Sequence, residues 1–462
     1  MRRGLLLWTI LWAFLSGAML AETRVPQSQP EITLSFAPLV KQAAPAVVNI
    51  YAKRIVQSRV SPFASDPFFR NFFGDLGPVR PRVQNSLGSG VILSSDGVIV
   101  SNYHVVGGAS DIRVVLKDRR EYVAEVLLGD QASDLAILRL KDAEGLPFLP
   151  LRDSNSVEVG ELTLAIGNPF GVGQTVSSGI ISGLARSGAV TGNERGYFIQ
   201  TDAPINPGNS GGALIGMDGA LIGVNTAIVT RSGGSNGIGF AIPAALVEQF
   251  IAQARAGETA FKRPWAGMGG QTIDADLAGS LGLERPGGMA ITQVQEGSPF
   301  GAVGLGVGDV IVAANGREVN SPSEMLYYMT VAGIGGEIEV EAIQDGTSRV
   351  FTVAMIGPPE LPPREEMTLG ERDILPGLKI ANVNPAVLAE HQLPILPSGV
   401  VVLETGQIAP RVGVQKGDLL REIDGVEITS PQDVIEAFED ARRSISIVVE
   451  RGGQMALLRF RI

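Results

Sequence analysis

Short apolar runs alternate with turn residues over the first half of the chain, from Ala43 to about Gly239. Each run is only a few residues long and rich in valine and isoleucine, and the turns between runs are built from glycine, asparagine and aspartate. This pattern is typical of many short strands joined by tight connections. The sequence therefore predicts two paired β-barrels for this region. The clearest runs are Val47–Ile55, Gly90–Leu93, the run that ends near His104, Leu135–Leu140, and the short strands within Leu214–Ile228.

The periodicity changes directly after this region. Between Pro243 and Arg255 the apolar residues recur at helical spacing, and Gly257 follows as a stop signal. We expect a helix here that closes the first domain. Its apolar positions are Leu246, Val247, Phe250, Ile251 and Ala254.

The second half of the chain contains an internal repeat. Residues 304–322 align without gaps on residues 413–431, and both copies carry a hairpin turn signal followed by a Ser-Pro helix start. The sequence therefore predicts two copies of one small domain. Residues 357–366, rich in proline and acidic residues, predict a stiff, solvated linker between them.

Composition agrees with a β-rich, multidomain protein. At 462 residues the chain is long enough for about three domains, and 58 glycines and 28 prolines favour turn-rich architecture. The net charge of −11 argues against nucleic acid as a main partner. With two histidines, no cysteine and no phosphate-binding glycine loop, we expect no metal site and no cofactor.

The N-terminus has the three parts of a secretory signal. Arg2 and Arg3 precede the apolar stretch Leu5–Phe14, and small residues follow, with cleavage expected after Ala21 or Ala18. A membrane anchor is the alternative, but Leu5–Leu20 is short for a span. We expect residues 1–21 to be a signal peptide and the mature protein to carry no membrane anchor.

One serine lies in an unusual loop, Gly208-Asn209-Ser210-Gly211-Gly212. A serine hydroxyl needs a base to take its proton and an acid to orient that base. His104 ends an apolar, strand-like run, and Asp134 directly precedes another. We therefore expect His104, Asp134 and Ser210 to form a hydrolytic triad.

The same loop also fits the Gly-x-Ser-x-Gly nucleophile elbow of α/β-hydrolases. An elbow enzyme runs serine, acid, histidine, and the only histidine after Ser210 is His391, far beyond the first domain. The order His104, Asp134, Ser210 is that of chymotrypsin-like enzymes. Strand-like residues with a turn at Met217–Ala220 follow the serine, where an elbow would be followed by a helix.

These motifs together resemble the HtrA/Deg family of serine proteases, with the two-PDZ, periplasmic, Do-like members as the nearest likeness. The resemblance covers the chain after its leader. The segments that carry it are Gly88–Ile92, Ser101–Val105, Asp134–Leu138, Gly167–Gly171, Thr201–Leu214, Gly223–Ala227 and Gly237–Pro243.

The resemblance implies a mainly β fold, with a chymotrypsin-like double β-barrel protease domain followed by two PDZ domains. We expect a trypsin-like protease domain at 22–260 that contains a regulatory loop at about 56–86. The first PDZ domain is expected at 262–357, the linker at 358–373 and the second PDZ domain at 374–462.

Within the protease domain, the amides of Gly208 and Ser210, with Asn209 between them, are expected to form the oxyanion hole. The resemblance implies that the strand after the serine borders the substrate cleft, with Ile205 and Ile228 lining the primary pocket. No acid stands at either position, so we expect small or medium aliphatic residues before the cleaved bond. The substrate-binding residues implied are Ile205, Thr226, Ala227, Ile228, Val229 and Thr230.

PDZ domains bind an extended peptide as an added strand and receive its carboxylate on loop amides. By resemblance the loop is Ala266-Gly267-Met268-Gly269 in the first copy and Leu375-Pro376-Gly377-Leu378 in the second. Pro376 supplies no N–H donor. We therefore expect peptide binding by the first copy, whereas the second copy is either a peptide site or mainly an assembly contact.

An aromatic insertion, Ser61–Asp75, carries five of the 17 phenylalanines. Such a loop either packs on its own barrel or contacts a partner surface. The resemblance favours a regulatory loop that reaches the active site of a neighbouring subunit in a trimer-based homo-oligomer.

Two functions are compatible with these features. The first is an ATP-independent periplasmic serine endopeptidase that degrades misfolded or damaged envelope proteins and recognises their C-terminal peptides through its PDZ domains. It would also have chaperone activity if it follows other family members. The alternative is a peptide-binding chaperone or scaffold with a mostly idle protease site.

Overall fold

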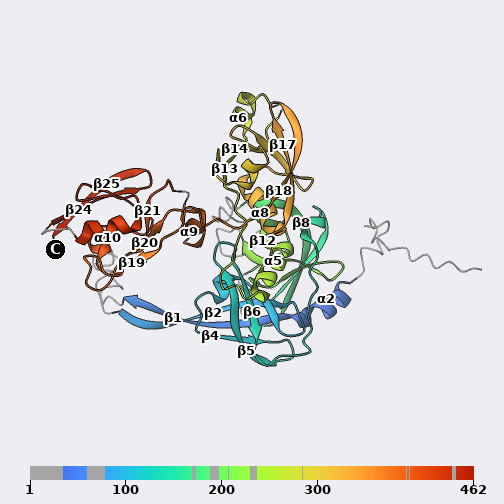
Figure 1. The fold of residues 1–462 in the computed structure, drawn as a ribbon. Helices are drawn as coiled ribbons and strands as arrows, with labels where there is room; N and C mark the ends of the chain where they lie inside the picture. The colour runs from blue at the N-terminus through green and yellow to red at the C-terminus, as the bar shows by residue number, and fades with distance from the viewer. Residues whose placement is uncertain are drawn as a thin grey trace, which may run out of the picture.

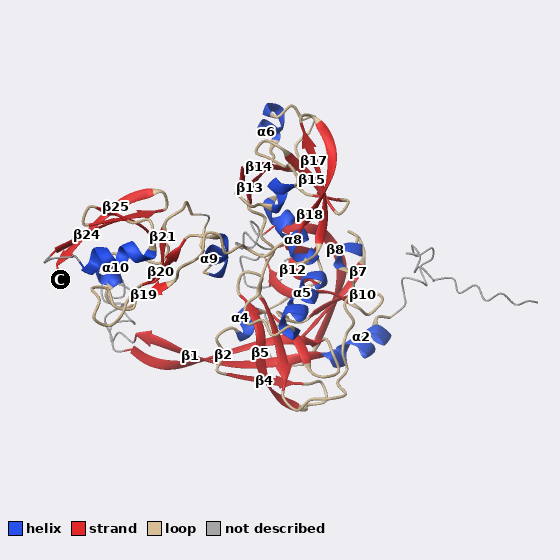
Figure 2. Cartoon of the chain, in the orientation of Figure 1, coloured by secondary structure: helices blue, strands red, loops and turns tan. Residues whose placement is uncertain are grey.

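The computed structural model describes residues 35–59, 79–168, 173–187, 197–206, 208–228, 237–283, 285–391, 393–394, 396–439 and 444–461. Strands dominate, and they form two closed barrels and two further sheets (Figures 1 and 2). This arrangement confirms the predicted fold class. The signal-peptide prediction at 1–21 and the aromatic insertion at Ser61–Asp75 lie outside the described residues.

The first barrel follows the helical segments α2 (Ala37–Ala43) and η1 (Ala44–Ala46). Its inward positions are valine, isoleucine and leucine, nearly all fully buried, as the apolar pattern predicts. Its strands, in barrel order, are β1 (Val47–Arg59), β2 (Val79–Ile92), β3 (Val98–Ser101), β6 (Leu135–Leu140), β5 (Glu121–Asp130) and β4 (Asp111–Val115).

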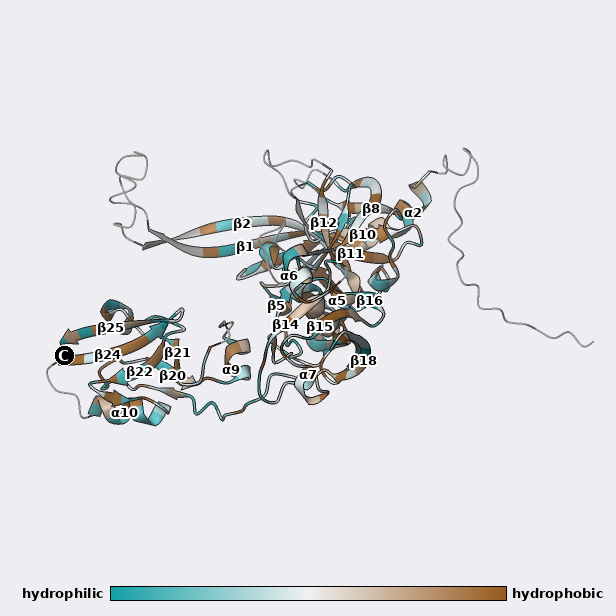
Figure 3. Ribbon diagram, turned by 90° about the horizontal axis from the view of Figure 1, so that it is seen from above, coloured by the Kyte–Doolittle hydropathy of each residue, from teal (hydrophilic) through white to brown (hydrophobic). Residues whose placement is uncertain are grey.

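β1 and β2 continue as a paired ribbon that projects from the first barrel (Figure 3). Their register runs from Val47 opposite Val91 to Arg59 opposite Val79. Hydrogen bonds between β1 and β2 satisfy the backbone groups of these residues where the two strands leave the barrel. The regulatory loop expected at about 56–86 thus begins and ends in paired strand.

The second barrel is closed in the same way and includes the short helix η2 (Ser154–Ser156) before its first strand. The predicted turn Met217–Ala220 joins two of its strands, which confirms strands rather than a helix after the serine. Its strands, in barrel order, are β10 (Ala213–Gly216), β11 (Leu221–Ile228), β12 (Gly239–Pro243), β9 (Tyr197–Thr201), β8 (Thr175–Ser187) and β7 (Leu162–Gly167).

Helix α5 (Ala244–Arg255) begins one residue after the predicted Pro243, ends at the predicted Arg255 and closes the two barrels. Leu246, Val247 and Phe250 are buried on its inner face, and the helix contacts β5, β6, β11 and β12. Phe250 stacks on Phe261 with ring centroids 3.8 Å apart. The stacked pair holds the chain that leaves the helix against the first domain.

The first C-terminal sheet has the predicted hairpin and helix signals in place. Asn315 and Gly316 have φ of 48° and 73°, as a tight hairpin turn requires, and the Ser321 hydroxyl caps the following helix. The strands run β13 (Met268–Thr272), β14 (Met289–Val294), β15 (Val310–Ala314), β17 (Glu337–Gln344) and β18 (Thr347–Ala354), and β16 (Arg317–Glu318) pairs with β15; the helices are α6 (Ala275–Ser280), α7 (Pro299–Ala302) and α8 (Pro322–Ala332).

The first sheet is joined to the barrels through α8. This helix contacts α5, β8 and β9, and the Tyr327 ring lies 3.7 Å from the Tyr197 ring in a parallel stack. The Gln249 side chain donates a 2.8 Å hydrogen bond to the Val331 carbonyl. One hydrophobic cluster therefore continues from the first barrel through part of the second barrel into the first sheet.

The second C-terminal sheet has its own core and repeats the topology of the first, with one further strand added at an edge. Its strands run β19 (Met367–Thr368), β20 (Lys379–Asn382), β21 (Val400–Glu404), β22 (Leu419–Ile423), β24 (Ser444–Arg451) and β25 (Gln454–Arg461), and β23 (Val426–Glu427) pairs with β22; the helical segments are α9 (Pro385–Glu390), η4 (Ala409–Val412) and α10 (Pro431–Glu439).

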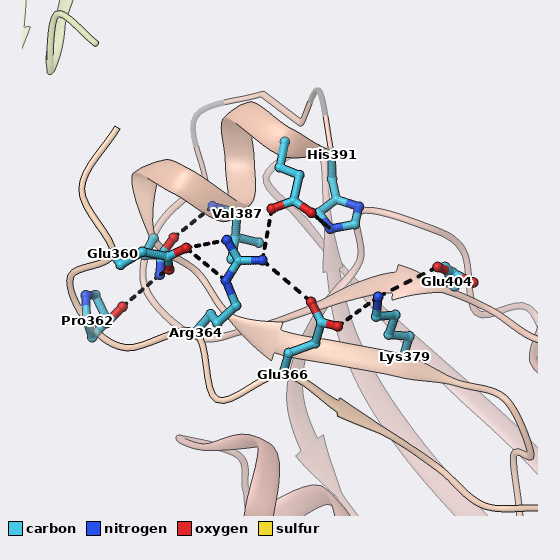
Figure 4. A network of polar contacts seen from close by, with 10 residues as sticks. Glu360, Pro362, Arg364, Glu366, Lys379, Val387, His391 and Glu404 are labelled. Atoms are coloured by element: carbon cyan, nitrogen blue, oxygen red, sulfur yellow. Dashed lines mark hydrogen bonds and ion pairs between the residues drawn. The ribbon is translucent and has the colours of Figure 1, made fainter. Parts of the chain in front are cut away.

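The segment expected to be a linker, 358–373, is partly fastened to this second sheet. β19 pairs with β20, and Arg364 lies between Glu360, Glu366 and Glu390 in a network of ion pairs (Figure 4). The carboxylates hold the guanidinium and so fix the chain before β19. These residues are therefore less solvated than a free linker.

Candidate active site

His104 and Asp134 are paired at the edge of the first barrel. His104 lies in a helical turn, α4 (Tyr103–Val106), that follows β3, so its expected place at the end of a strand was wrong: Ser101 ends the strand. The ring Nδ1 lies 2.8 Å from Asp134 Oδ2 and 3.0 Å from Oδ1. The His104 backbone N–H also donates to Oδ1 at 2.9 Å, so one carboxylate holds both the ring and its backbone.

Asp134 itself has an unusual backbone conformation. Its φ of 53° is left-handed, which costs a non-glycine residue roughly 1–2 kcal/mol. The turn before β6 compensates, since the Asp134 carbonyl accepts hydrogen bonds from the Tyr103 N–H at 3.1 Å and the Asn102 amide at 3.0 Å. These contacts join the acid to the residues directly before the histidine.

Ser210 lies in the loop between β9 and β10. Its hydroxyl donates a 3.1 Å hydrogen bond to the Thr226 carbonyl, and no hydrogen bond joins it to His104 within the part of the chain that the structure describes. The Thr226 hydroxyl donates to Asp134 Oδ2 at 2.6 Å. Thr226 therefore links serine and acid, a role that its expected place beside the substrate did not include.

Gly208 and Gly211 give the serine loop its shape, with φ of 99° and 82°. A Cβ at Gly211 would lie 2.1 Å from the Ser89 carbonyl, so only glycine fits there. Ser89 holds the loop: its N–H donates to the Ser210 carbonyl at 2.9 Å and its hydroxyl to the Gly208 carbonyl at 2.7 Å. The role of Ser89 in holding this loop was not predicted from the sequence, although Ser89 lies in the motif Gly88–Ile92.

The expected oxyanion donors are unused. Among the described residues, the amides of Gly208 and Ser210 have no hydrogen-bond acceptor, whereas the Asn209 N–H donates to the Asn206 carbonyl at 2.9 Å. The two outer amides are thus available to an oxygen atom beside Ser210. This is the pattern that an oxyanion hole needs.

The expected substrate-binding residues are only partly visible. Thr226, Ala227 and Ile228 lie in β11, which pairs with β12, whereas Val229 and Thr230 lie outside the described residues. Ile205 is 1% exposed and packs in the second-barrel core, beneath Gly239. Its side chain therefore lies behind the surface in this conformation.

The two expected carboxylate loops differ. In the first loop, the carbonyls of Ala266 and Gly267 accept hydrogen bonds from Ser298 and Gln295. The amides of Ala266 and Gly267 themselves have no acceptor in the described part of the chain. In the second loop, the amides are already engaged: Gly377 donates to the Leu369 carbonyl at 2.9 Å and Leu378 to the Leu375 carbonyl at 3.1 Å.

The other histidine, His391, lies far from this site, at the C-terminal end of α9 (Figure 4). Burial lowers the pKa of its ring, and its Nε2 has no hydrogen-bond partner among the described residues, although Glu390 Oε1 lies 3.9 Å away. Among the described residues, no group of three or more His, Asp or Glu side chains could hold a metal ion. No helix in the described ranges is long and apolar enough to cross a membrane.

Comparison with known proteins identifies the domains. Residues 88–224 match the model of the trypsin-like peptidase domain, and residues 266–355 and 399–451 each match a PDZ domain model. The chain is 36% identical to a probable periplasmic serine endoprotease DegP-like of Halomonas elongata, with 98% of each chain covered. A protein of the same name from Marinomonas sp. is 35% identical, covering 92% of this chain and 93% of the relative.

Solved structures agree. The HtrA-type protease AlgW with a decapeptide is 40% identical, with a TM-score of 0.52, and covers 71% of this chain and 99% of its own. The same protease with a tripeptide is 37% identical, with a TM-score of 0.53, and covers 71% and 98%. The chain is therefore a periplasmic serine protease that belongs to the HtrA family, among its DegP-like endoproteases.

Proposed function

We propose that this protein degrades misfolded or damaged envelope proteins without ATP, using Ser210 as nucleophile, His104 as general base and Asp134 as the orienting acid. The observation that carries the proposal is the bidentate approach of Asp134 to His104 Nδ1, with Thr226 joining the acid to the serine. A carboxylate on Nδ1 directs the other ring nitrogen, Nε2, toward the substrate.

In the proposed mechanism, the Ser210 hydroxyl first turns from the Thr226 carbonyl to His104 Nε2. The oxygen then attacks the peptide carbonyl while His104 takes the proton, and His104 returns a proton to the leaving amine. The Gly208 and Ser210 amides would stabilise the oxyanion. A water molecule then attacks the acyl carbonyl while His104 takes its proton, and His104 returns a proton to the Ser210 oxygen as the acyl group leaves.

This orientation of the hydroxyl corresponds to a resting site, because Ser210 is hydrogen-bonded to the Thr226 carbonyl and not to His104. Substrate binding would shift the equilibrium between the resting and the turned orientation only if substrate favours the turned one. We infer that activity depends on substrate or PDZ ligand, in a homo-oligomer based on trimers. A protein that stays in the resting state would instead act as the peptide-binding chaperone.

A digestion experiment tests the proposed function. The full chain, without ATP, is incubated with an unfolded, carboxymethylated protein and with the same protein in its native, disulfide-bonded form. We expect fragments from the unfolded form only, and mass spectrometry should place the cuts after small or medium aliphatic residues. Unfolded protein that stays soluble and intact would support the chaperone instead, and cuts after Lys or Arg would overturn the pocket assignment.

The first PDZ domain is the proposed site for C-terminal peptides. β13 is the edge strand of its sheet and pairs only with β14 among the described strands, so its other edge can accept an extended peptide. The amides of Ala266 and Gly267, at the start of that strand, would receive the carboxylate. An added strand and a terminal carboxylate would therefore be recognised together.

The corresponding edge of the second PDZ domain is occupied by its own chain. β19 lies antiparallel on β20, and the Leu369 carbonyl accepts the Gly377 N–H where a peptide carboxylate would sit. The Leu369 side chain is 3% exposed and packs in the core of this domain. We infer that this copy is closed to peptides, which favours the assembly role.

Peptide binding distinguishes the two copies. In a Ser210→Ala background, a labelled peptide with a free C-terminal carboxylate should bind once per chain. Gly267→Ala should weaken it roughly tenfold or more, because a Cβ there would lie 2.7 Å from Trp265 and displace the loop that donates to a charged group. Gly377→Ala, a matched change at φ 76°, should leave affinity unaltered. Two equivalents per chain, or loss of binding only in Gly377→Ala, would contradict the assignment.

A further inference from the structure

The segment between α5 and β13 touches the turn that carries Asp134. Arg263, in this segment, directs its guanidinium at the Asp130 carboxylate, with Nη2 on Oδ2 and Nη1 3.4 Å from Oδ1. Nη2 also donates a 2.7 Å hydrogen bond to the Ser133 hydroxyl. One side chain, distant in sequence, therefore binds both the last residue of β5 and the residue directly before Asp134.

This contact is largely shielded from water. Asp130 is 7% exposed and the Arg263 side chain 20%. The guanidinium lies over the Phe261 ring, 5.1 Å from its centroid, and Phe261 stacks on Phe250 of α5. Arg263 is thus fixed by the helix that closes the barrels, and a buried carboxylate depends on it for charge compensation.

The turn needs such support, because Asp134 has a left-handed backbone. Within the turn, the Ser133 N–H donates to Asp130 Oδ2 at 2.7 Å, whereas the Asp134 N–H reaches the Gln131 carbonyl only at 3.3 Å. Asn102 and Tyr103 hold the carbonyl side of Asp134. Arg263, acting on Asp130 and Ser133, holds the opposite side.

We propose that Arg263 is a positioning residue for the triad acid: through Asp130 and Ser133 it fixes the backbone that directs the Asp134 carboxylate at His104. The inference rests on the proposed role of Asp134. A carboxylate displaced by about 1 Å would lose its two-oxygen contact with the ring, and misplacement of that size costs on the order of 10²-fold in rate.

The test compares full-length Arg263→Ala and Arg263→Lys with wild type on a fluorogenic peptide. We expect Arg263→Ala to lower kcat on the order of 10²-fold with little change in KM. Its acidic limb of kcat against pH should move to lower pH, because an imidazolium that loses a nearby carboxylate has a lower pKa. Arg263→Lys keeps the charge without the two-pronged contact and should restore part of both properties.

Arg451→Ala is the matched control. Arg451 makes an equivalent two-nitrogen contact with Asp418, which is fully buried in the second PDZ domain, far in the fold from the triad. This variant should lose thermal stability but keep the wild-type kcat and pH profile. Ser133→Ala removes the hydroxyl contact without unpairing a charge, so it reports on the same turn if Arg263→Ala fails to fold. We expect a several-fold lower kcat and the same direction of pH shift.

A wild-type pH profile of kcat in Arg263→Ala would overturn the inference, whether or not the melting temperature or kcat of this variant falls. If Arg263→Ala does not fold, an unshifted pH profile in Ser133→Ala would overturn it. Failure of the proposed function is distinguishable, since wild type itself would then show no hydrolysis dependent on Ser210.

Discussion

Replacing Ser210 by alanine is expected to lower kcat for peptide hydrolysis on the order of 10⁶-fold, the loss seen when the nucleophile of a triad is removed. The remaining groups cannot form an acyl intermediate, so only slow attack by water is left. The fold should tolerate the change, because the Ser210 side chain makes one hydrogen bond in the described structure, to the Thr226 carbonyl. A fluorogenic peptide assay with thermal melting measures both properties.

Ser177→Ala is a suitable control for this variant. The Ser177 hydroxyl also donates to a single backbone carbonyl, that of Pro204, and lies in the same barrel outside the triad. We expect near wild-type turnover from it. Appreciable hydrolysis by purified Ser210→Ala would show that another group is the nucleophile.

Replacing Asp134 by asparagine should lower kcat about 10⁴-fold near neutral pH. The amide keeps the shape of the side chain, but it can present an N–H to His104 Nδ1 and so favour the tautomer that cannot accept the serine proton. It also removes the negative charge that stabilises the imidazolium. The Thr226 hydroxyl, which donates to Oδ2, would lose a charged acceptor.

The pH dependence of kcat separates the loss of the negative charge from the change of tautomer. Since the loss of a carboxylate lowers the pKa of a neighbouring imidazole, the acidic limb of residual kcat should lie at lower pH than in wild type. Steady-state kinetics across pH would measure this. A variant within tenfold of wild type, with an unmoved limb, would remove Asp134 from the triad.

Much of the fold follows from local sequence patterns. The helix over Ala244–Arg255, the turn at Met217–Ala220 and the hairpin turns at Asn315-Gly316 and Asp424-Gly425 each depend on a few neighbouring residues. Such signals are readable because spacing and turn chemistry act over short range. Chain order likewise predicted a triad of His104, Asp134 and Ser210, and the structure pairs the first two directly.

Contacts between segments distant in sequence could not be predicted from the sequence. Ser89 bonds to the Ser210 loop, and Arg263 bonds to Asp130, across more than a hundred residues of chain. Neither pair has a spacing that marks it in the sequence, since only the closed barrels bring them together. The pairing of β19 with β20 was missed because a proline-rich acidic segment has the composition of a linker.

Covalent labelling can show whether Ser210 is the catalytic nucleophile. The full chain is treated with a fluorophosphonate probe in the presence of an unfolded protein, and mass spectrometry locates the adduct. We predict one adduct per chain, on Ser210, and none in Ser210→Ala or when His104 is replaced by alanine. If the wild type carried no label on Ser210, even with unfolded substrate present, Ser210 would not be the nucleophile.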